Sequence, residues 1–178
     1  SSAVVPLRRL FAKVTAELAL AYDDASITDV YIRNLNGTLS VFGESAASSS
    51  ADILSDVEYS SASGSYGSYV FYVPENRQGV IGSASDSHGK NPDLDPAIAA
   101  VSDRLTYMEV GVALDGRDYA GEVTYRSYLG SDAVKDFDVV GNKRYVWRVT
   151  YLEDNLQYDD WKVETGDMNV FDYVLEVV

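Results

Sequence analysis

Several stretches of this chain alternate between apolar and polar residues with a period of two. Between residues 10 and 22, apolar side chains share one parity, while Lys13, Thr15 and Glu17 share the other. Residues 106–114 alternate in the same way. Successive side chains of a strand point to opposite faces, so this period predicts strands with one buried and one solvated face. Alanine, leucine and glutamate in the first stretch also suit a helix, but the alternation favours a strand.

Turn signals separate further strands. Asn36-Gly37 lies between residues 29–35 and 38–42 and predicts a hairpin, because this dipeptide tolerates positive φ at both central positions. The same Asn36 begins an Asn-Gly-Thr glycosylation sequon, although the turn is the favoured interpretation. Later turns are predicted at Asp115-Gly116 and Gly141-Asn142. The other predicted strands are residues 69–73, 121–129, 144–152, 161–163 and 171–178.

Two long polar segments interrupt these strands. Serine accounts for ten of the 26 residues from 43 to 68, and residues 77–96 are rich in Gly, Asp and Ser. Such segments bury little apolar surface to offset their ordering entropy. We therefore expect long mobile loops, with one short anchored turn around residues 53–57 and a short helix at residues 96–104. Roughly eight strands with turns between them predict an all-β fold, an antiparallel β-sandwich with long Ser/Gly-rich loops.

Composition supports strands and argues against several classes of partner. The chain has 178 residues, of which 14 are tyrosine and two are methionine, and aromatic residues suit a half-buried pleated surface. The net charge is −14, and no stretch of the sequence gathers Lys or Arg, so we expect no binding to nucleic acid. There is no cysteine, which excludes disulfides and zinc–thiolate sites. No apolar run approaches the length of a membrane-spanning helix.

The residue types that an enzyme or a metal site needs are sparse. His88 is the single histidine and lies in a polar loop without a strand-anchored partner, so we expect it to be solvated rather than catalytic. No G-x-S-x-G elbow presents a serine nucleophile. We predict no catalytic residue, no metal site and no cofactor. Acid pairs occur without the calcium-loop pattern D-x-[DN]-x-[DN]-G and are interpreted as solvated turns: Asp93 and Asp95, Glu153-Asp154, and Asp159-Asp160.

One predicted strand carries an aromatic-rich face, formed by Tyr145, Trp147, Val149 and Tyr151. Aromatic rings stack on pyranose rings, so this face is a candidate platform for a sugar. Aromatic residues that alternate along a strand more often fill the core of a sandwich. Both interpretations stay open, and the core is the favoured one.

Five short motifs follow one another along residues 9–163. Residues 9–14 read R-x-x-A-K-V, residues 72–79 read Y-x-P-E-N-x-x-G, and residues 106–110 read T-Y-x-E-V. Residues 128–145 are similar to a Y-L-G … D-F-N-V-x-R-N-x-x-Y block, and Trp161 follows it. In this order the motifs resemble those of Bacteroidales fimbrillin-like and fimbrial accessory lipoproteins, found at the tip or anchor of a fimbria. Asp138 stands where the family has Asn and Gly141 where it has Arg, so any role of that Arg does not carry over.

The resemblance implies a transthyretin-like or immunoglobulin-like sandwich, exported as a lipoprotein and displayed at the cell surface, in the outer membrane or in a fimbria. It also implies assembly by strand exchange, since an unpaired edge offers backbone hydrogen-bonding groups to a strand from another subunit. Arg8-Arg9 is a candidate site for a trypsin-like processing protease. For the segment that contains Arg8-Arg9, and for the candidate exchange strand near the other end of the chain, an ordinary terminal strand of a closed fold is an equal alternative. The candidate exchange strand carries four residues on one parity: Phe171, Tyr173, Leu175 and Val177.

These observations predict a non-enzymatic structural or adhesive subunit of a bacterial surface fimbria. Its expected partners are other fimbrial subunits, with a host or glycan ligand as a further candidate, and any membrane contact is expected through a lipid anchor outside this chain. The alternative function is a carbohydrate-binding module of a surface lipoprotein. We expect one sandwich unit over residues 1–178, with a separate amino-terminal domain at residues 1–42 as the alternative. The family's earliest strands have no counterpart here, so we interpret the chain as an excerpt of a longer protein.

Overall fold

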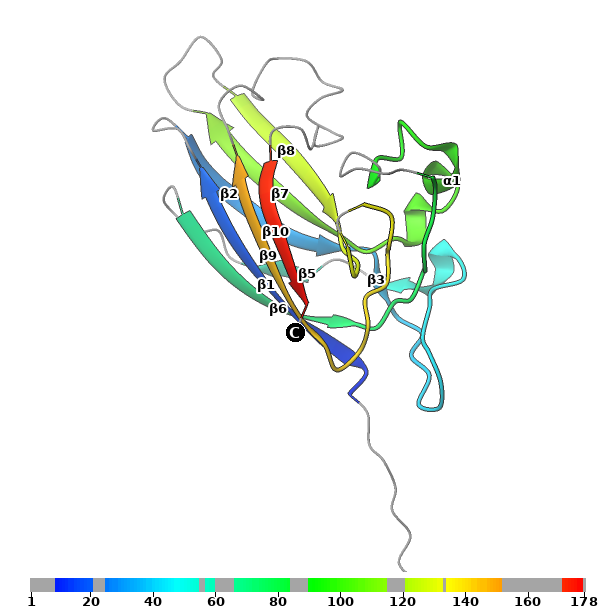
Figure 1. Ribbon diagram of the computed structural model, residues 1–178. Coiled ribbons are helices and arrows are strands. Elements are labelled where there is room, and N and C mark those ends of the chain that lie inside the picture. The colour runs from blue at the N-terminus through cyan, green and yellow to red at the C-terminus, as the bar shows by residue number, and fades with distance from the viewer. Residues whose placement is uncertain are drawn as a thin grey trace, which may run out of the picture.

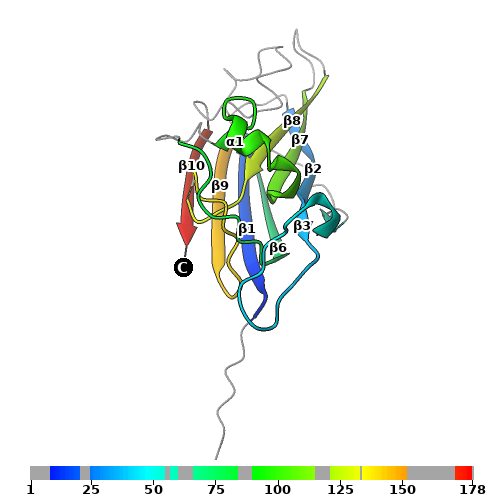
Figure 2. The ribbon, with the colours of Figure 1, turned by 90° about the vertical axis from the view of Figure 1, so that its right-hand side faces the viewer.

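The strands of the protein form two four-stranded sheets that lie face to face (Figure 1, Figure 2). Sheet I has the order β10-β9-β1-β6, and sheet II has the order β5-β2-β7-β8. The predicted all-β sandwich is thereby confirmed. The structure, a computed structural model, describes residues 9–20, 25–54, 57–59, 66–83, 90–114, 121–132, 134–151 and 171–177.

Most predicted strands are present with small shifts in their boundaries. Sheet I contains β1 (Phe11–Leu20), β6 (Tyr66–Pro74), β9 (Arg144–Tyr151) and β10 (Phe171–Val177). Sheet II contains β2 (Ala25–Arg33), β5 (Val57–Tyr59), β7 (Tyr107–Leu114) and β8 (Gly121–Tyr128). The predicted turn at Asp115-Gly116 and the predicted strand at residues 161–163 lie outside the described residues.

Smaller elements connect the strands of the two sheets. The strands β3 (Leu35–Asn36) and β4 (Ile53–Leu54) pair with each other, and η1 (Ser50–Asp52) precedes β4. The predicted helical segment at residues 96–104 contains α1 (Pro96–Ala99) and η3 (Ser102–Arg104). No helix in the described part of the chain is long and apolar enough to cross a membrane.

Neighbouring strands in both sheets run antiparallel, with one exception. The central strand β1 pairs antiparallel with β6 but parallel with β9. A parallel pair needs a crossover between its strands, and here the chain passes through sheet II between β1 and β9. The parallel pairing of β1 and β9 is therefore possible because the connection between these strands crosses to the other sheet.

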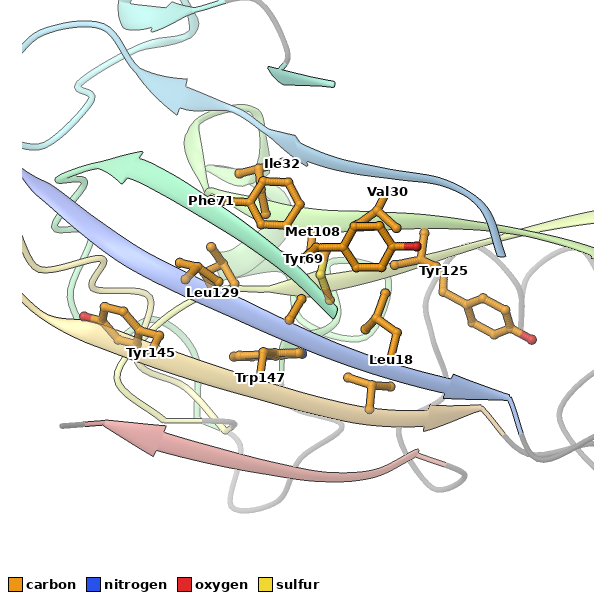
Figure 3. Packing of buried hydrophobic residues seen from close by; sticks show 14 of the residues in the cluster. Leu18, Val30, Ile32, Tyr69, Phe71, Met108, Tyr125, Leu129, Tyr145 and Trp147 are labelled. Atoms are coloured by element: carbon orange, nitrogen blue, oxygen red, sulfur yellow. The ribbon is translucent and has the colours of Figure 1, made fainter. Parts of the chain in front are cut away.

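The core lies between the two sheets, where alternate residues of each strand meet (Figure 3). On β1, Lys13 is exposed while its neighbours Ala12 and Val14 are buried. Fully burying a side chain such as Leu or Phe stabilises the fold by about 1.5–3 kcal/mol, so this alternation supplies much of the stability. Large side chains that are almost completely buried include Leu18, Ile32, Phe71, Met108 and Trp147.

The predicted hairpin at Asn36-Gly37 is wrong. Asn36 belongs to β3 and pairs with Ile53 of β4, whereas residues 38–42 form no strand. The backbone turns earlier, at Asn34, whose φ is 56°. Long-range pairing with β4 therefore replaces the local hairpin.

The buried Asn36 side chain explains why the local turn preference is overridden. Its Nδ2 donates to the backbone carbonyl of Glu75 at 2.8 Å, and its Oδ1 accepts from the Thr38 N–H at 2.9 Å. A buried amide whose oxygen and nitrogen both have hydrogen-bond partners is costly to move. The same burial leaves no exposed amide for the glycosylation sequon.

The serine-rich segment is more ordered than its composition predicts. Where the structure describes it, this segment contains η1, β4 and β5, and β6 begins at Tyr66. The Asp52 carboxylate accepts hydrogen bonds from Ser48, Ser49 and Thr38. These bonds, the one from the Ser48 hydroxyl first, lower the pKa of Asp52 from 3.8 to about 2. Local bonding by Ser and Asp thus supplies order that apolar burial does not.

Candidate functional site

The start of β1, the end of β6 and the start of β9 gather at one end of sheet I, here called the base (Figure 1). Glu75 follows β6 directly and its side chain is fully buried at the base. Its Oε1 accepts from the Ser45 N–H at 2.9 Å, and its Oε2 accepts from the Gly141 N–H at 2.8 Å. Nε of Arg77 lies 3.5 Å from Oε2. A buried carboxylate needs such hydrogen bonds and a counter-charge to offset its desolvation.

Backbone hydrogen bonds close the same region. Two bonds fix the first residues of β1 against the turn before β9, namely Asn142 N–H to Phe11 O and Lys13 N–H to Lys143 O, both at 2.9 Å. A third, from Glu75 N–H to Leu10 O at 2.8 Å, joins the residue before β1 to the end of β6. A Cβ on Gly141 would meet the Arg9 carbonyl oxygen at 2.6 Å. The turn therefore needs glycine at this position, where the family motif has Arg.

Two of the motifs recognised in the sequence lie side by side at the base. Asn76 and Val139 exchange backbone hydrogen bonds of 2.9 Å, and the Phe137 N–H donates to Gly79 O at 2.9 Å. The Asn76 side chain accepts from the Ala47 N–H at 3.0 Å. Residues 76–79 thus join two segments that are distant in sequence, one at Ala47 and one at residues 137–139.

A groove with a volume of about 560 Å³ lies on this base, and we call it the cationic groove. Four basic residues line it, namely Arg9, Lys13, Lys143 and Arg144. Two exposed aromatic residues, Phe11 and Tyr72, line it as well, together with Leu10 and Asn142. The described lining contains no acidic residue.

Strand register places three of these side chains in one row across sheet I. Lys13 on β1 pairs with Tyr72 on β6 and with Arg144 on β9. Residues paired across neighbouring strands point to the same face of a sheet, and in an antiparallel pair such as β1–β6 their Cβ atoms lie about 4.5–5.5 Å apart. All three are exposed, so the row lies on the solvent face of the sheet.

The candidate exchange strand is β10, at one edge of sheet I. Within the described residues β10 pairs only with β9, in antiparallel register. The register sets Phe171, Tyr173, Leu175 and Val177 opposite Tyr151, Val149, Trp147 and Tyr145, respectively. At the other terminus, Arg9 is exposed just before β1, while Arg8 lies outside the described residues.

Of the other residues considered for chemistry, only Asp93 and Asp95 belong to the described part of the chain. His88 and the acid pairs at residues 153–154 and 159–160 lie outside the described residues. Asp95 caps α1 by accepting from the Ala97 N–H at 2.8 Å, and Asp93 is exposed. In the parts of the chain that the structure describes, no three His, Cys, Asp or Glu side chains lie close enough to hold a metal ion.

The aromatic face of β9 belongs to the core. Tyr145 and Trp147 are each 2% exposed, and Val149 is also buried. Figure 3 shows Tyr145 and Trp147 on β9 turned towards the packed interior. The face therefore offers no platform for a sugar at these two rings.

Sequence reasoning missed the cationic groove because its basic residues are distant along the chain. Arg9 and Lys13 lie near one end and Lys143 and Arg144 near the other, so no local stretch is rich in Lys or Arg. The alternation of β1 does place Lys13 on a solvent face. The parallel pairing of β1 with β9 was needed to complete the groove, and no local pattern predicts it.

Comparisons with known proteins agree with this fold. A family model described as a domain of unknown function (DUF4906) matches residues 71–149. No curated protein matches the chain. Among solved structures, the chain is similar to the tip fimbrial protein Mfa3 from Porphyromonas gingivalis, studied with a C-terminal truncation, with 11% identity and a TM-score of 0.51. It is also similar to a protein from Parabacteroides distasonis provisionally named a cell adhesion protein, with 16% identity and a TM-score of 0.52.

These likenesses extend over nearly all of the chain and half of each relative. Both alignments cover 96% of this chain, but only 51% and 52% of the other two. The chain therefore spans about half the length of these structures. At such low identity the likeness shows the fold, and it confirms the resemblance to Bacteroidales fimbrial proteins inferred from the motifs.

Proposed function

We propose that this chain is a non-enzymatic structural or adhesive subunit of a bacterial surface fimbria. The observation that carries the proposal is the shared fold with a tip fimbrial protein over 96% of the chain. The five motifs that follow one another along residues 9–163 support it independently of the fold.

We further propose that the subunit assembles by strand exchange through β10. An edge strand is held on one side only, so its place can be taken by an equivalent strand from a neighbouring subunit. The register supports this role, because Leu175 pairs with Trp147 and Tyr173 with Val149, two buried positions of β9. A strand inserted beside β9 would complete sheet I.

Arg8-Arg9 is the proposed processing site. Arg9 is exposed and lies ahead of β1, so a trypsin-like protease could cut after Arg8 without cutting a strand of either sheet and without removing Arg9 from the cationic groove. Replacing both arginines by glutamine should abolish cleavage by such a protease at this position, as read by mass spectrometry of the product. Cleavage that continues at the same peptide bonds would remove Arg8 and Arg9 from consideration.

The partners and location follow from the same proposal. The partners are other fimbrial subunits, and the site of action is the cell surface, with any lipid anchor outside this chain. A lipoprotein leader in the full-length precursor, beside genes for related fimbrial proteins, would support this location. A cytoplasmic precursor in an unrelated gene neighbourhood would contradict it.

A disulfide lock tests strand exchange directly. Arg148 and Val174 are paired across β9 and β10, and the chain has no native cysteine. The double variant Arg148→Cys/Val174→Cys should form an intramolecular disulfide, because directly paired strand residues have suitable Cα separations. If β10 exchanges, the oxidised variant stays monomeric when mixed with the other fimbrial subunits, and reduction restores assembly.

Each single cysteine variant serves as a control and should assemble like the original chain. Assembly is read by size-exclusion chromatography and electron microscopy. An oxidised double variant that assembles as well as the reduced one would refute exchange of β10, while leaving the fold and the subunit role intact.

A further inference from the structure

We propose that the cationic groove binds an anionic saccharide, a sugar that carries carboxylate or sulfate groups. This inference rests on the adhesive role proposed above and gives it a ligand class and a site. The groove is distinct from β10 and from the aromatic face of β9, which is buried.

The charge of the groove is the first step of the argument. Four basic residues converge there although the whole chain has twice as many acidic as basic residues, 28 against 14. Within the described residues, no salt bridge engages Lys13, Lys143 or Arg144. By contrast, Arg148 lies on the same strand as Arg144 and donates to Glu17 at 2.7 Å. A group of cations without acidic partners favours an anion, which relieves their mutual repulsion.

Exposed aromatic rings beside these cations are the second step. The Tyr72 side chain is 66% exposed and Phe11 is 47% exposed, whereas most aromatic side chains of the described core are buried. A ring next to a cation suits a ligand that has both a flat apolar face and a negative charge. An acidic pyranose has both, because its C–H face stacks on a ring and its carboxylate or sulfate pairs with Lys or Arg.

The position of the groove favours a sugar over an acidic peptide. Peptides recognised by sheets gain most affinity from main-chain hydrogen bonds along an unpaired edge. The groove instead lies on the face of sheet I, over β1, which is paired on both sides. Its volume of about 560 Å³ falls in the range of small-ligand pockets, roughly 300–1,000 Å³. The groove is therefore sized for one or two sugar units.

The groove is also preorganised. Its two walls are residues 9–13 and 142–144, and they are joined by backbone hydrogen bonds and by the Glu75 carboxylate behind them. Binding sites that are fixed before the ligand arrives lose less conformational entropy on binding. The net charge of −14 repels long polyanions, so a short acidic oligosaccharide is the expected ligand.

Isothermal titration calorimetry on the full chain tests the proposal with four sugar ligands and with a tetraglutamate peptide, which carries acidic groups without a sugar ring. The probes are tetragalacturonate, sialyllactose and a heparin-derived tetrasaccharide, with the neutral methyl ester of tetragalacturonate as the matched control. At least one acidic probe should bind, and carboxylate and sulfate sources are distinguished by which one does. If tetragalacturonate binds, its methyl ester should bind at least about tenfold more weakly, because charged hydrogen bonds are lost.

Three substitutions locate the site. Lys13→Gln, Arg144→Gln and Tyr72→Ala should each weaken binding about five- to tenfold, the range expected for exposed charged and stacking contacts. Arg148→Gln is the matched control, because Arg148 is exposed on the same strand but outside the groove, and its affinity should not change. Circular dichroism and thermal unfolding check that every variant keeps the fold.

Four results would overturn the proposal. They are no binding of any acidic sugar at millimolar concentration, equal binding of the acid and its ester, equal binding of a tetraglutamate peptide, or equal losses for Arg148→Gln and Lys13→Gln. None of these results changes the outcome expected in the disulfide-lock experiment. Failure of the sugar-binding proposal can therefore be distinguished from failure of the strand-exchange proposal. The strand-locked variant should bind the sugar normally.

Discussion

Glu75 shows how a single residue organises the base of sheet I. Its carboxylate is the common acceptor for backbone N–H groups from Ser45 and Gly141, and it lies beside the Arg77 guanidinium. Ser45 and Gly141 lie 30 and 66 residues from Glu75 in the sequence. Without the carboxylate, buried donors would lose their partners.

Replacing Glu75 should therefore destabilise the fold strongly. We expect Glu75→Ala to lower the free energy of unfolding by about 2–4 kcal/mol, because it leaves buried N–H groups unpaired and the Arg77 charge without its buried partner. Urea unfolding followed by circular dichroism measures the change. Glu44→Ala is the control, since Glu44 is exposed and also contacts Arg77; it should cost less than about 1 kcal/mol. Equal losses for the two variants would show that burial of the carboxylate is unimportant.

Residues of this kind are hard to predict from sequence. Burial of Trp147 could be predicted, because its neighbours on β9 alternate with polar residues. Glu75 and Asn36 could not, because the long-range partners that make their burial favourable lie 30 to 66 residues away in sequence. The motif resemblance marked Glu75 and Asn76 as notable, but it gave no reason for their positions.

At the scale of elements, period-two alternation was a reliable signal and local turn chemistry was less so. The strands β1, β7, β8 and β9 were all predicted from alternation between turns. The pair β3–β4 was missed because two-residue strands carry no period. The parallel pairing of β1 with β9 was missed because strand order depends on chain crossing between sheets, which no local pattern encodes.

The connection between β8 and β9 has its own anchor, Lys90. Its ammonium group donates to the backbone carbonyl of Asp132 and lies 4.9 Å from the centre of the Phe137 ring. Burial lowers the pKa of Lys90 from 10.5 to about 8, although Asp132 and Asp136 act in the opposite direction. The unfolded chain therefore binds more protons than the native one between about pH 8 and 10.5.

This difference predicts that Lys90 makes stability rise with pH. Since stability increases with pH wherever the unfolded state holds more protons, the Lys90 contribution should grow by about 2 kcal/mol between pH 7.5 and 9.5. Below pH 8 the Lys90 amine is charged in both the folded and the unfolded chain, so the folded state bears the whole cost of desolvating this charge. Urea unfolding of the original chain and of Lys90→Met at both pH values measures it. The difference between the two proteins should change with pH, and a constant difference would contradict the lowered pKa.

At the scale of the whole molecule, charge is distributed unevenly. The chain carries a net charge of −14, yet the base of sheet I presents four basic residues together. The net charge argues against nucleic acid as an expected partner, but it does not predict a local surface of opposite sign. This surface forms because the fold brings the start of β1, the end of β6 and the start of β9 together at the base.

The same arrangement bears on whether residues 1–42 are a separate domain, as one interpretation of the sequence proposed. β1 lies between β9 and β6 in sheet I, and β2 lies between β5 and β7 in sheet II. A chain that begins at residue 43 would lose an internal strand from each sheet. It would also expose apolar surface on both sides of the core, including the partners of Leu18 and Val30.

We therefore expect a variant that lacks residues 1–42 to show no cooperative unfolding transition. A domain's net stability is only about 5–15 kcal/mol, and each large apolar side chain removed from the core forfeits about 1.5–3 kcal/mol. Near-ultraviolet circular dichroism and thermal unfolding measure the outcome. A variant that lacks only residues 1–8, which precede β1, is the control and should unfold cooperatively. If the shorter chain unfolds with the midpoint of the original, residues 1–42 are a separate domain, and β1 and β2 do not belong to the folding unit of the remaining strands.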